Sequence, residues 1–259
     1  MRILLRAAAI FVVVAYLCPL AGVQAAGEVY QVSTINALLQ GVYDGETTLD
    51  ELKRHGDFGI GTFDALDGEM VVLEGQAYQV KDTGQVIPAD GAAKTPFATV
   101  TFFQPSRAVG ANYIKDYEQL QNALDRLITD RNYFYAIRVD GLFTYVKTRS
   151  VPGQSKPYQP LAAVTKNQPV FEYENIQGTL VGFWCPQFVK GINVPGYHLH
   201  FISDDRQKGG HLLALRLKKG IISIAPITGF RLVLPETDGF RRAVLDGDRQ
   251  KELKAAEQE

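Results

Sequence analysis

The sequence predicts an α+β protein of two domains, with mixed or antiparallel β-sheets and a few helices. Three observations predict this class. Apolar residues recur at helical spacing on one face of residues 117–128. Aromatic and β-branched runs separated by turn residues fill most of the second half of the chain. Between these parts, Pro152, Pro157, Pro160 and Pro169 mark a segment typical of a domain boundary.

Residues 1–26 are expected to be a secretory signal that is removed. Two arginines in "MRILLR" precede the apolar run "AAAIFVVVAYL", and "GVQAA" supplies the small residues of a cleavage site. The run is shorter than the ~20 apolar residues of a membrane-spanning helix. We therefore expect an exported protein, periplasmic or secreted, with no membrane association after the signal is removed. Since Cys18 lies in the signal, Cys185 remains alone, and its aromatic neighbours indicate a small buried hydrophobe.

An N-terminal α/β domain is expected over residues 27–165. Ser33 or Thr34 can cap a short helix, and "TTLDELKRHG" predicts a second helix. "MVVLEG", "AYQV" and "FATVTFFQP" suit strands, and the spacing in "IKDYEQLQNALDRLITD" predicts the clearest helix. Two strand-like runs then flank Asp140 and Gly141, a dipeptide typical of a two-residue hairpin.

A mostly antiparallel β domain, carrying the metal site and a C-terminal tail, is expected over residues 166–259. Its strands are predicted in "VFEYENIQGTLVGFWCP", "GYHLHFIS", "HLLALRLKKG" and "ISIAPITGFRLVLP". The tail, "FRRAVLDGDRQKELKAAEQE", is polar and is expected to be partly helical.

Charge and motifs exclude two classes of ligand. The formal net charge is −1 and no basic stripe is present, so nucleic acid is not an expected partner. Gly59 and Gly61 lack the third glycine and the preceding strand that a dinucleotide-binding loop needs.

Three of the four histidines fall within "YHLHFISDDRQKGGH", residues 197–211. Alternation along a strand points His198 and His200 to the same face. The polar, glycine-containing turn after them returns the chain, so that His211 can lie beside both. Three neutral imidazoles suit Zn²⁺ and leave a coordination position open, although copper, iron and nickel also accept imidazole. The remaining histidine, His55, is expected at the surface or at a helix cap.

A three-histidine metal site does not by itself name a reaction. The metal could generate hydroxide for hydration or hydrolysis, or act as a Lewis acid on a chelating substrate. An exported protein that only binds metal is a third possibility.

The mature chain resembles the α-acetolactate decarboxylase family over nearly its whole length. The resemblance rests on "STINALLQGVYDGETTLDELKRHGDFGIGTFDALDGEM", "KTPFATVTFF", "FYAIRVDGLFTYVKTRSVP", "GTLVGFWCP", "NVPGYHLHFISDDRQKGGHLLAL" and "LPETDGF". It implies zinc-dependent conversion of (S)-2-acetolactate to (R)-acetoin and CO₂, with no macromolecular substrate and a possible homodimer. The tail stretch "RRAVLDGDRQKELK" departs from the family pattern.

The resemblance also implies a set of site residues. The zinc ligands fall on His198, His200 and His211. The other site residues fall on Glu69 in "DGEM", Arg149 before "SVP", Thr62 in "GIGTF" and Glu257 near the C-terminus. The arginine would bind the carboxylate or the enediolate oxygens, and a buried carboxylic acid would deliver the proton. The alternative is an exported zinc hydratase or hydrolase that uses metal-bound hydroxide.

Overall fold

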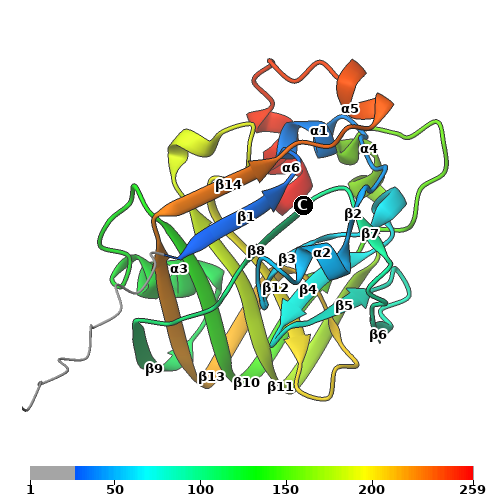
Figure 1. Ribbon diagram of the computed structural model, residues 1–259. Coiled ribbons are helices and arrows are strands. Elements are labelled where there is room, and N and C mark those ends of the chain that lie inside the picture. Colours follow the sequence, from blue (N-terminus) through cyan, green and yellow to red (C-terminus); the bar gives the residue numbers. More distant parts are fainter. Residues whose placement is uncertain (1–26, 259) are drawn as a thin grey trace, which may run out of the picture.

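The computed structural model describes residues 27–258 and has two main β-sheets packed face to face (Figure 1). The expected signal lies outside the described residues. The first sheet has the order β14-β1-β8-β3-β4-β5-β6 and is antiparallel apart from the parallel pair β1–β14. Its strands are β1 (Glu28–Val32), β3 (Phe58–Thr62), β4 (Glu69–Leu73), β5 (Gln76–Val80), β6 (Val86–Pro88), β8 (Ala98–Thr101) and β14 (Gly229–Val233).

The second sheet has five antiparallel strands in the order β10-β11-β12-β13-β9. Because β10 also pairs with β13, the ladder formed by β10, β11, β12 and β13 closes on itself. A separate two-stranded ladder joins β2 (Thr47–Thr48) to β7 (Lys94–Thr95). The five strands are β9 (Arg107–Ile114), β10 (Phe134–Arg149), β11 (Val170–Cys185), β12 (Gly196–Ser203) and β13 (Gly209–Ile227).

The helices are short, and side chains cap several of them. Thr34, Thr48, Asp116 and Thr237 each accept a hydrogen bond from a backbone N–H of the first turn that follows. The predicted helices after Thr34, around residue 50 and between residues 117 and 125 are confirmed. The α-helices are α1 (Ile35–Leu39), α2 (Leu49–Leu52), α3 (Tyr117–Asp125), α4 (Leu161–Val164), α5 (Asp238–Arg242) and α6 (Gln250–Gln258), and the 3₁₀ helices are η1 (Asp64–Leu66), η2 (Thr165–Asn167) and η3 (Gln187–Val189).

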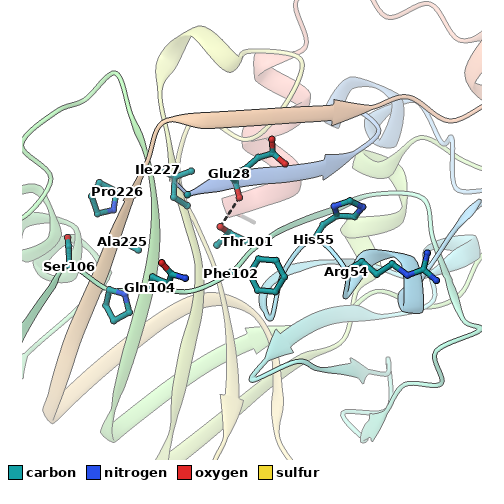
Figure 2. A pocket seen from close by; sticks show the side chains of 12 residues that line it. Glu28, Arg54, His55, Thr101, Phe102, Gln104, Ser106, Ala225, Pro226 and Ile227 are labelled. Carbon is teal, nitrogen blue, oxygen red and sulfur yellow. Dashed lines mark hydrogen bonds between the residues drawn. The ribbon is translucent and has the colours of Figure 1, made fainter. Parts of the chain in front are cut away.

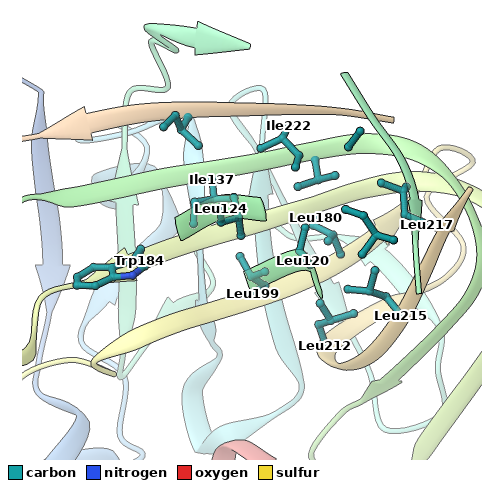
Figure 3. Packing of buried hydrophobic residues seen from close by; sticks show 14 of the residues in the cluster. Leu120, Leu124, Ile137, Leu180, Trp184, Leu199, Leu212, Leu215, Leu217 and Ile222 are labelled. Atoms are coloured by element: carbon teal, nitrogen blue, oxygen red, sulfur yellow. The ribbon is translucent and has the colours of Figure 1, made fainter. Parts of the chain in front are cut away.

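The core lies in layers around the sheets. Leu120 and Leu124 of α3 pack on Ile137, Leu180 and Leu199 of the five-stranded sheet (Figure 3). A second cluster fills the space between the two sheets. A third joins α1, α4 and α6, which lie together near the C-terminus (Figure 1). Burial of these apolar faces stabilises the packing of the helices on the sheets by ~25 cal/mol for each Å² of apolar surface removed from water.

The prediction of a hairpin at Asp140 and Gly141 is wrong, because β10 runs through both residues without a turn. Gly141 faces Gly178 of β11 and Gly220 of β13, so three glycines meet across three strands. A Cβ on Gly141 would lie 2.5 Å from the carbonyl oxygen of Lys219. The glycines therefore allow close approach of long strands, which local turn chemistry does not reveal.

The predicted domain boundary between residues 165 and 166 falls between β10 and β11, which are neighbours in one sheet. β14, which follows that position, forms an edge of the seven-stranded sheet beside β1. Each large sheet therefore contains strands from both sides of the boundary, and the two-domain division stays a prediction. Within residues 27–258, no helix has the length and apolarity to cross a membrane.

Candidate metal centre and active site

The β12–β13 hairpin brings the three histidines together as the sequence predicts. His198 and His200 lie two residues apart on β12, and His211 of β13 is the cross-strand partner of His200. The ring centroids are 5.1 to 5.3 Å apart. Candidate ligand nitrogens of all three lie within 4.8 Å of one another. This clustering matches a three-histidine metal site.

The protonation of His200 is fixed by its surroundings. Its Nδ1 lies 2.9 Å from the carbonyl oxygen of Met70, so this nitrogen carries the hydrogen and donates it. Its Nε2 is buried and has no hydrogen-bond partner among the described residues. An unsatisfied buried acceptor is rare unless a ligand occupies it. The free lone pair of Nε2 therefore fits a metal ion.

Burial also keeps the imidazoles neutral. Burial and, to a smaller extent, the positive charge of Arg149 together lower the pKa of His198 to about 3. Burial lowers the pKa of His200 and of His211 well below the ordinary value as well. Because only neutral imidazole can ligate a cation, the site favours metal binding at neutral pH.

Glu69 enters the cluster from the other sheet. It is the first residue of β4, directly after Gly68, whose φ of +91° suits glycine. Its side chain is only 8% exposed, and its Oε2 lies 3.6 Å from His200 Nε2. Burial raises the pKa of Glu69 to about 7, while the Arg149 guanidinium opposes that rise. The site thus contains a carboxyl group that can carry a proton at neutral pH.

Arg149 joins the two sheets and the C-terminal tail. It is the last residue of β10 and the cross-strand neighbour of His211. Its Nη1 donates to Glu69 Oε1 at 2.9 Å and its Nη2 donates to the carbonyl oxygen of Ala256 at 2.6 Å. Its Nε is buried without a hydrogen-bond partner in the described part of the chain. A buried guanidinium with an unused donor is suited to an anionic ligand.

The tail places Glu257 against the histidines. Glu257 Oε2 lies 3.5 Å from His198 Nε2 and 3.9 Å from His211 Nε2. The Glu257 carbonyl oxygen also lies 3.1 Å from His211 Nε2. Burial raises the pKa of Glu257 to about 7, with Arg149 opposing the rise. The structure therefore places this glutamate of the polar tail beside the three histidines, and its role at a metal site stays a prediction.

Thr62 lines the same cavity, but its hydroxyl group is hydrogen-bonded to the backbone. Its Oγ1 donates to the carbonyl oxygen of Gly68 at 2.7 Å, and Thr62 pairs with Glu69 between β3 and β4. The hydroxyl therefore holds the turn that delivers Glu69.

The cavity at this cluster is small, about 30 Å³. By the usual ~10–15 Å³ per water, that is room for about two water molecules. An apolar wall completes it. Sequence reasoning missed the residues of this wall because their apolar side chains are indistinguishable from those of the ordinary core. They are Ile35, Leu38, Leu66, Phe97, Val151 and Leu161.

A larger cleft of about 580 Å³ lies elsewhere, beside His55 (Figure 2). His55 stacks on Tyr30 with ring centroids 3.8 Å apart, and His55 Nε2 lies 3.2 Å from Glu51 Oε1. Thr101 donates its hydroxyl hydrogen to the carbonyl oxygen of Glu28 at 2.8 Å. No second histidine lines this cleft, so it lacks the donor set of the three-histidine cluster.

Cys185 is 1% exposed at the end of β11 and packs in the cluster between the sheets. Burial raises the pKa of its thiol far above the ordinary value. The prediction of a buried small hydrophobe is confirmed, and a thiolate nucleophile is not available at neutral pH.

The chain matches the family model of alpha-acetolactate decarboxylase over residues 29–247. It is 50% identical to the alpha-acetolactate decarboxylase of Methanosarcina mazei over 228 residues, which are 88% of this chain and 79% of that protein. It is 46% identical to that of Methylococcus capsulatus over 89% of this chain and 88% of the relative. A crystal structure of the Bacillus subtilis protein superimposes with a TM-score of 0.87 at 41% identity, covering 90% of this chain and all of the other. The family model ends before α6, so Glu257 lies beyond the matched region.

Proposed function

We propose a specific reaction for this chain, which belongs to the alpha-acetolactate decarboxylase family and is therefore an acetolactate decarboxylase, a carbon–carbon lyase. In this proposal the protein converts (S)-2-acetolactate to (R)-acetoin and CO₂, with zinc held by His198, His200 and His211. The observation that carries the proposal is the contact of Arg149 with Glu69 beside His200, since a site that only stores metal needs no buried guanidinium. A zinc ion held by these imidazoles would act as a Lewis acid toward the hydroxyl and keto oxygens of the substrate.

Arg149 is the group suited to bind the substrate. Its side chain is 5% exposed, so its charge attracts an anion with little screening by water. A planar guanidinium can donate two hydrogen bonds to a carboxylate or to the paired oxygens of an enediolate. This favours a carboxylate substrate over the neutral substrates of hydration. The apolar wall of the cavity suits a substrate whose other groups are methyls.

Glu69 and Glu257 are suited to deliver the proton. When the bond to the carboxylate breaks, CO₂ leaves and the bonding electron pair passes toward the neighbouring carbonyl, giving an enediolate. Protonation at carbon then produces acetoin. Both carboxyls have a pKa of about 7, so each is substantially protonated at neutral pH. They come from different elements, β4 and α6, and a fixed donor on one side sets the configuration of the product.

A single assay tests the proposal. Purified, zinc-replete protein starting at residue 27 is given racemic acetolactate, and CO₂ and acetoin are measured with and without a chelator. We expect acetoin formation that the chelator abolishes and that zinc restores. Acetoin at only the spontaneous rate would contradict the proposal. His55→Ala is the matched control, because His55 lies outside the cluster and its loss should change neither zinc content nor turnover.

We also propose that the protein is exported and forms a homodimer. The charged start, the short apolar run and the small-residue exit of residues 1–26 support export. Resemblance to the family supports the dimer. Cell fractionation with N-terminal sequencing of the mature chain tests the first, and light scattering of the purified protein tests the second.

A further inference from the structure

Asn36 is a polar side chain in a helix whose five residues are all buried. It is 7% exposed. Its Nδ2 donates to the carbonyl oxygen of Leu245 at 3.0 Å and to that of Gly247 at 3.3 Å. Both acceptors lie in the loop between α5 and α6, more than 200 residues away along the chain. The carboxamide of α1 therefore holds the beginning of the C-terminal tail.

The space for this side chain is provided by Gly191, whose φ is +78°. A Cβ at residue 191 would lie 3.0 Å from Asn36 Nδ2, and the carbonyl oxygen of Gly191 accepts the Asn36 backbone N–H. The backbone N–H groups of Leu253 and Gln250, in contrast, donate to acceptors of the tail itself, the carbonyl oxygen of Arg249 and Asp248 Oδ1. Asn36 thus provides an external anchor for a loop that otherwise folds on itself.

The same helix meets the tail a second time, close to the metal site. Ile35 and Leu38 of α1 line the small cavity at the three histidines and share an apolar cluster with Ala256, which is fully buried. Ala256 precedes Glu257, and its carbonyl oxygen accepts a hydrogen bond from Arg149. Asn36 therefore holds the tail at Leu245 and Gly247, and the tail is held again at Ala256 beside the site.

We propose that Asn36 is a positioning residue for the decarboxylase reaction, acting through the tail to hold the carboxyl of Glu257 at the three histidines. The inference rests on the proposed function for the role of Glu257. The anchoring itself rests on contacts of this chain's own residues. Without the two hydrogen bonds, the loop before α6 gains freedom, and the fraction of time that Glu257 spends at the site decreases.

The test is Asn36→Asp, which keeps the shape but replaces both donors by a carboxylate facing two carbonyl oxygens. We expect about a tenfold loss of kcat, with zinc content unchanged and KM changed much less, as expected for loss of about two ordinary hydrogen bonds. Asn36→Ala removes the donors without adding charge, and it gives the same pattern if the aspartate variant does not fold. Asn112→Asp, at an exposed position on β9, is the control and should behave like the wild type.

A double-mutant cycle separates positioning from general damage. If Asn36 acts through Glu257, the kcat loss from Asn36→Asp disappears in a Glu257→Gln background. An equal loss in both backgrounds would overturn the proposal.

Hydrogen exchange gives a readout that does not depend on acetoin. Peptides covering residues 244–258 should exchange faster in Asn36→Asp, while those covering residues 196–211 keep their protection. Unchanged exchange in the tail would overturn the anchoring. If the wild type makes no acetoin, the proposed function fails, but this exchange result still decides whether Asn36 anchors the tail.

Discussion

At the scale of single residues, Arg149 is the side chain on which the site converges. Its two terminal nitrogens reach a carboxylate of one sheet and a backbone carbonyl of the tail, while β10 sets it beside His211. A lysine would keep the charge but could not span both acceptors with a fixed planar fork. The arrangement therefore depends on the shape of the guanidinium as well as on its charge.

Arg149→Lys should lower kcat/KM by roughly a hundredfold, because one or two charge-assisted hydrogen bonds are lost. Steady-state acetoin formation measures this, with zinc content checked in parallel. Arg54→Lys, at an exposed ion pair, is the matched control and should have little effect. Wild-type kcat/KM in Arg149→Lys would show that the fork is not needed.

The raised pKa values of Glu69 and Glu257 predict the direction of the pH dependence. Burial raises both to about 7, so the protonated, donating form is present below that pH and is lost as pH rises through it. Turnover should therefore fall with increasing pH above about 7, by about tenfold per unit for one required proton. A pH profile of kcat checks this, and a turnover that increases through that range would exclude a carboxyl donor.

At the scale of elements, the hairpin of β12 and β13 carries the three histidines and α6 brings Glu257 beside them. The period-two alternation of strands made the positions of His198 and His200 predictable, and the turn made His211 predictable. Nothing local predicts Glu69, Arg149 or Glu257, since Arg149 lies 80 residues from Glu69 and 107 from Ala256. Only the family resemblance pointed to them.

Removal of residues 255–259 should separate metal binding from turnover. The three histidines and Glu69 remain, so zinc should stay bound, while loss of Glu257 and of the buried Ala256 opens the cavity. We expect kcat to fall by about a hundredfold or more, because a positioned general acid typically contributes ~10²–10⁴-fold. Metal analysis and acetoin assays on the same preparation measure both quantities. Full turnover in the truncated protein would show that the tail is only a solvated end.

At the scale of the whole molecule, the two sheets are held together by apolar burial and also by the site itself. Glu69 belongs to the seven-stranded sheet, whereas Arg149 and the histidines belong to the five-stranded one. The α+β class and the strand-rich second half followed from periodicity, and both are confirmed. The uninterrupted path of β10 could not be predicted from periodicity. The pairing of Gly141 with Gly178 and Gly220 on the neighbouring strands stabilises a continuous strand where the local sequence indicates a turn.

Removal of the metal should lower the stability of the whole molecule. A cation that binds the folded site and not the unfolded chain stabilises by about 2.7 kcal/mol at a free concentration a hundred times Kd. Thermal unfolding with and without chelator should therefore give a lower Tm for the metal-free protein. His200→Ala should abolish this difference and His55→Ala should preserve it. An identical Tm in both conditions for the wild type would indicate that no tight metal site forms.

The position of Glu257 along the chain also has a consequence for the order of events during synthesis. Translation proceeds from the N-terminus, and earlier segments can fold first. Glu69, Arg149 and the three histidines all emerge before residue 257. If the proposed metal ion binds, it could therefore reach the three histidines while the side later covered by α6 is still open. Docking of the tail would then be the last step of maturation, when a loaded but inactive protein becomes an enzyme.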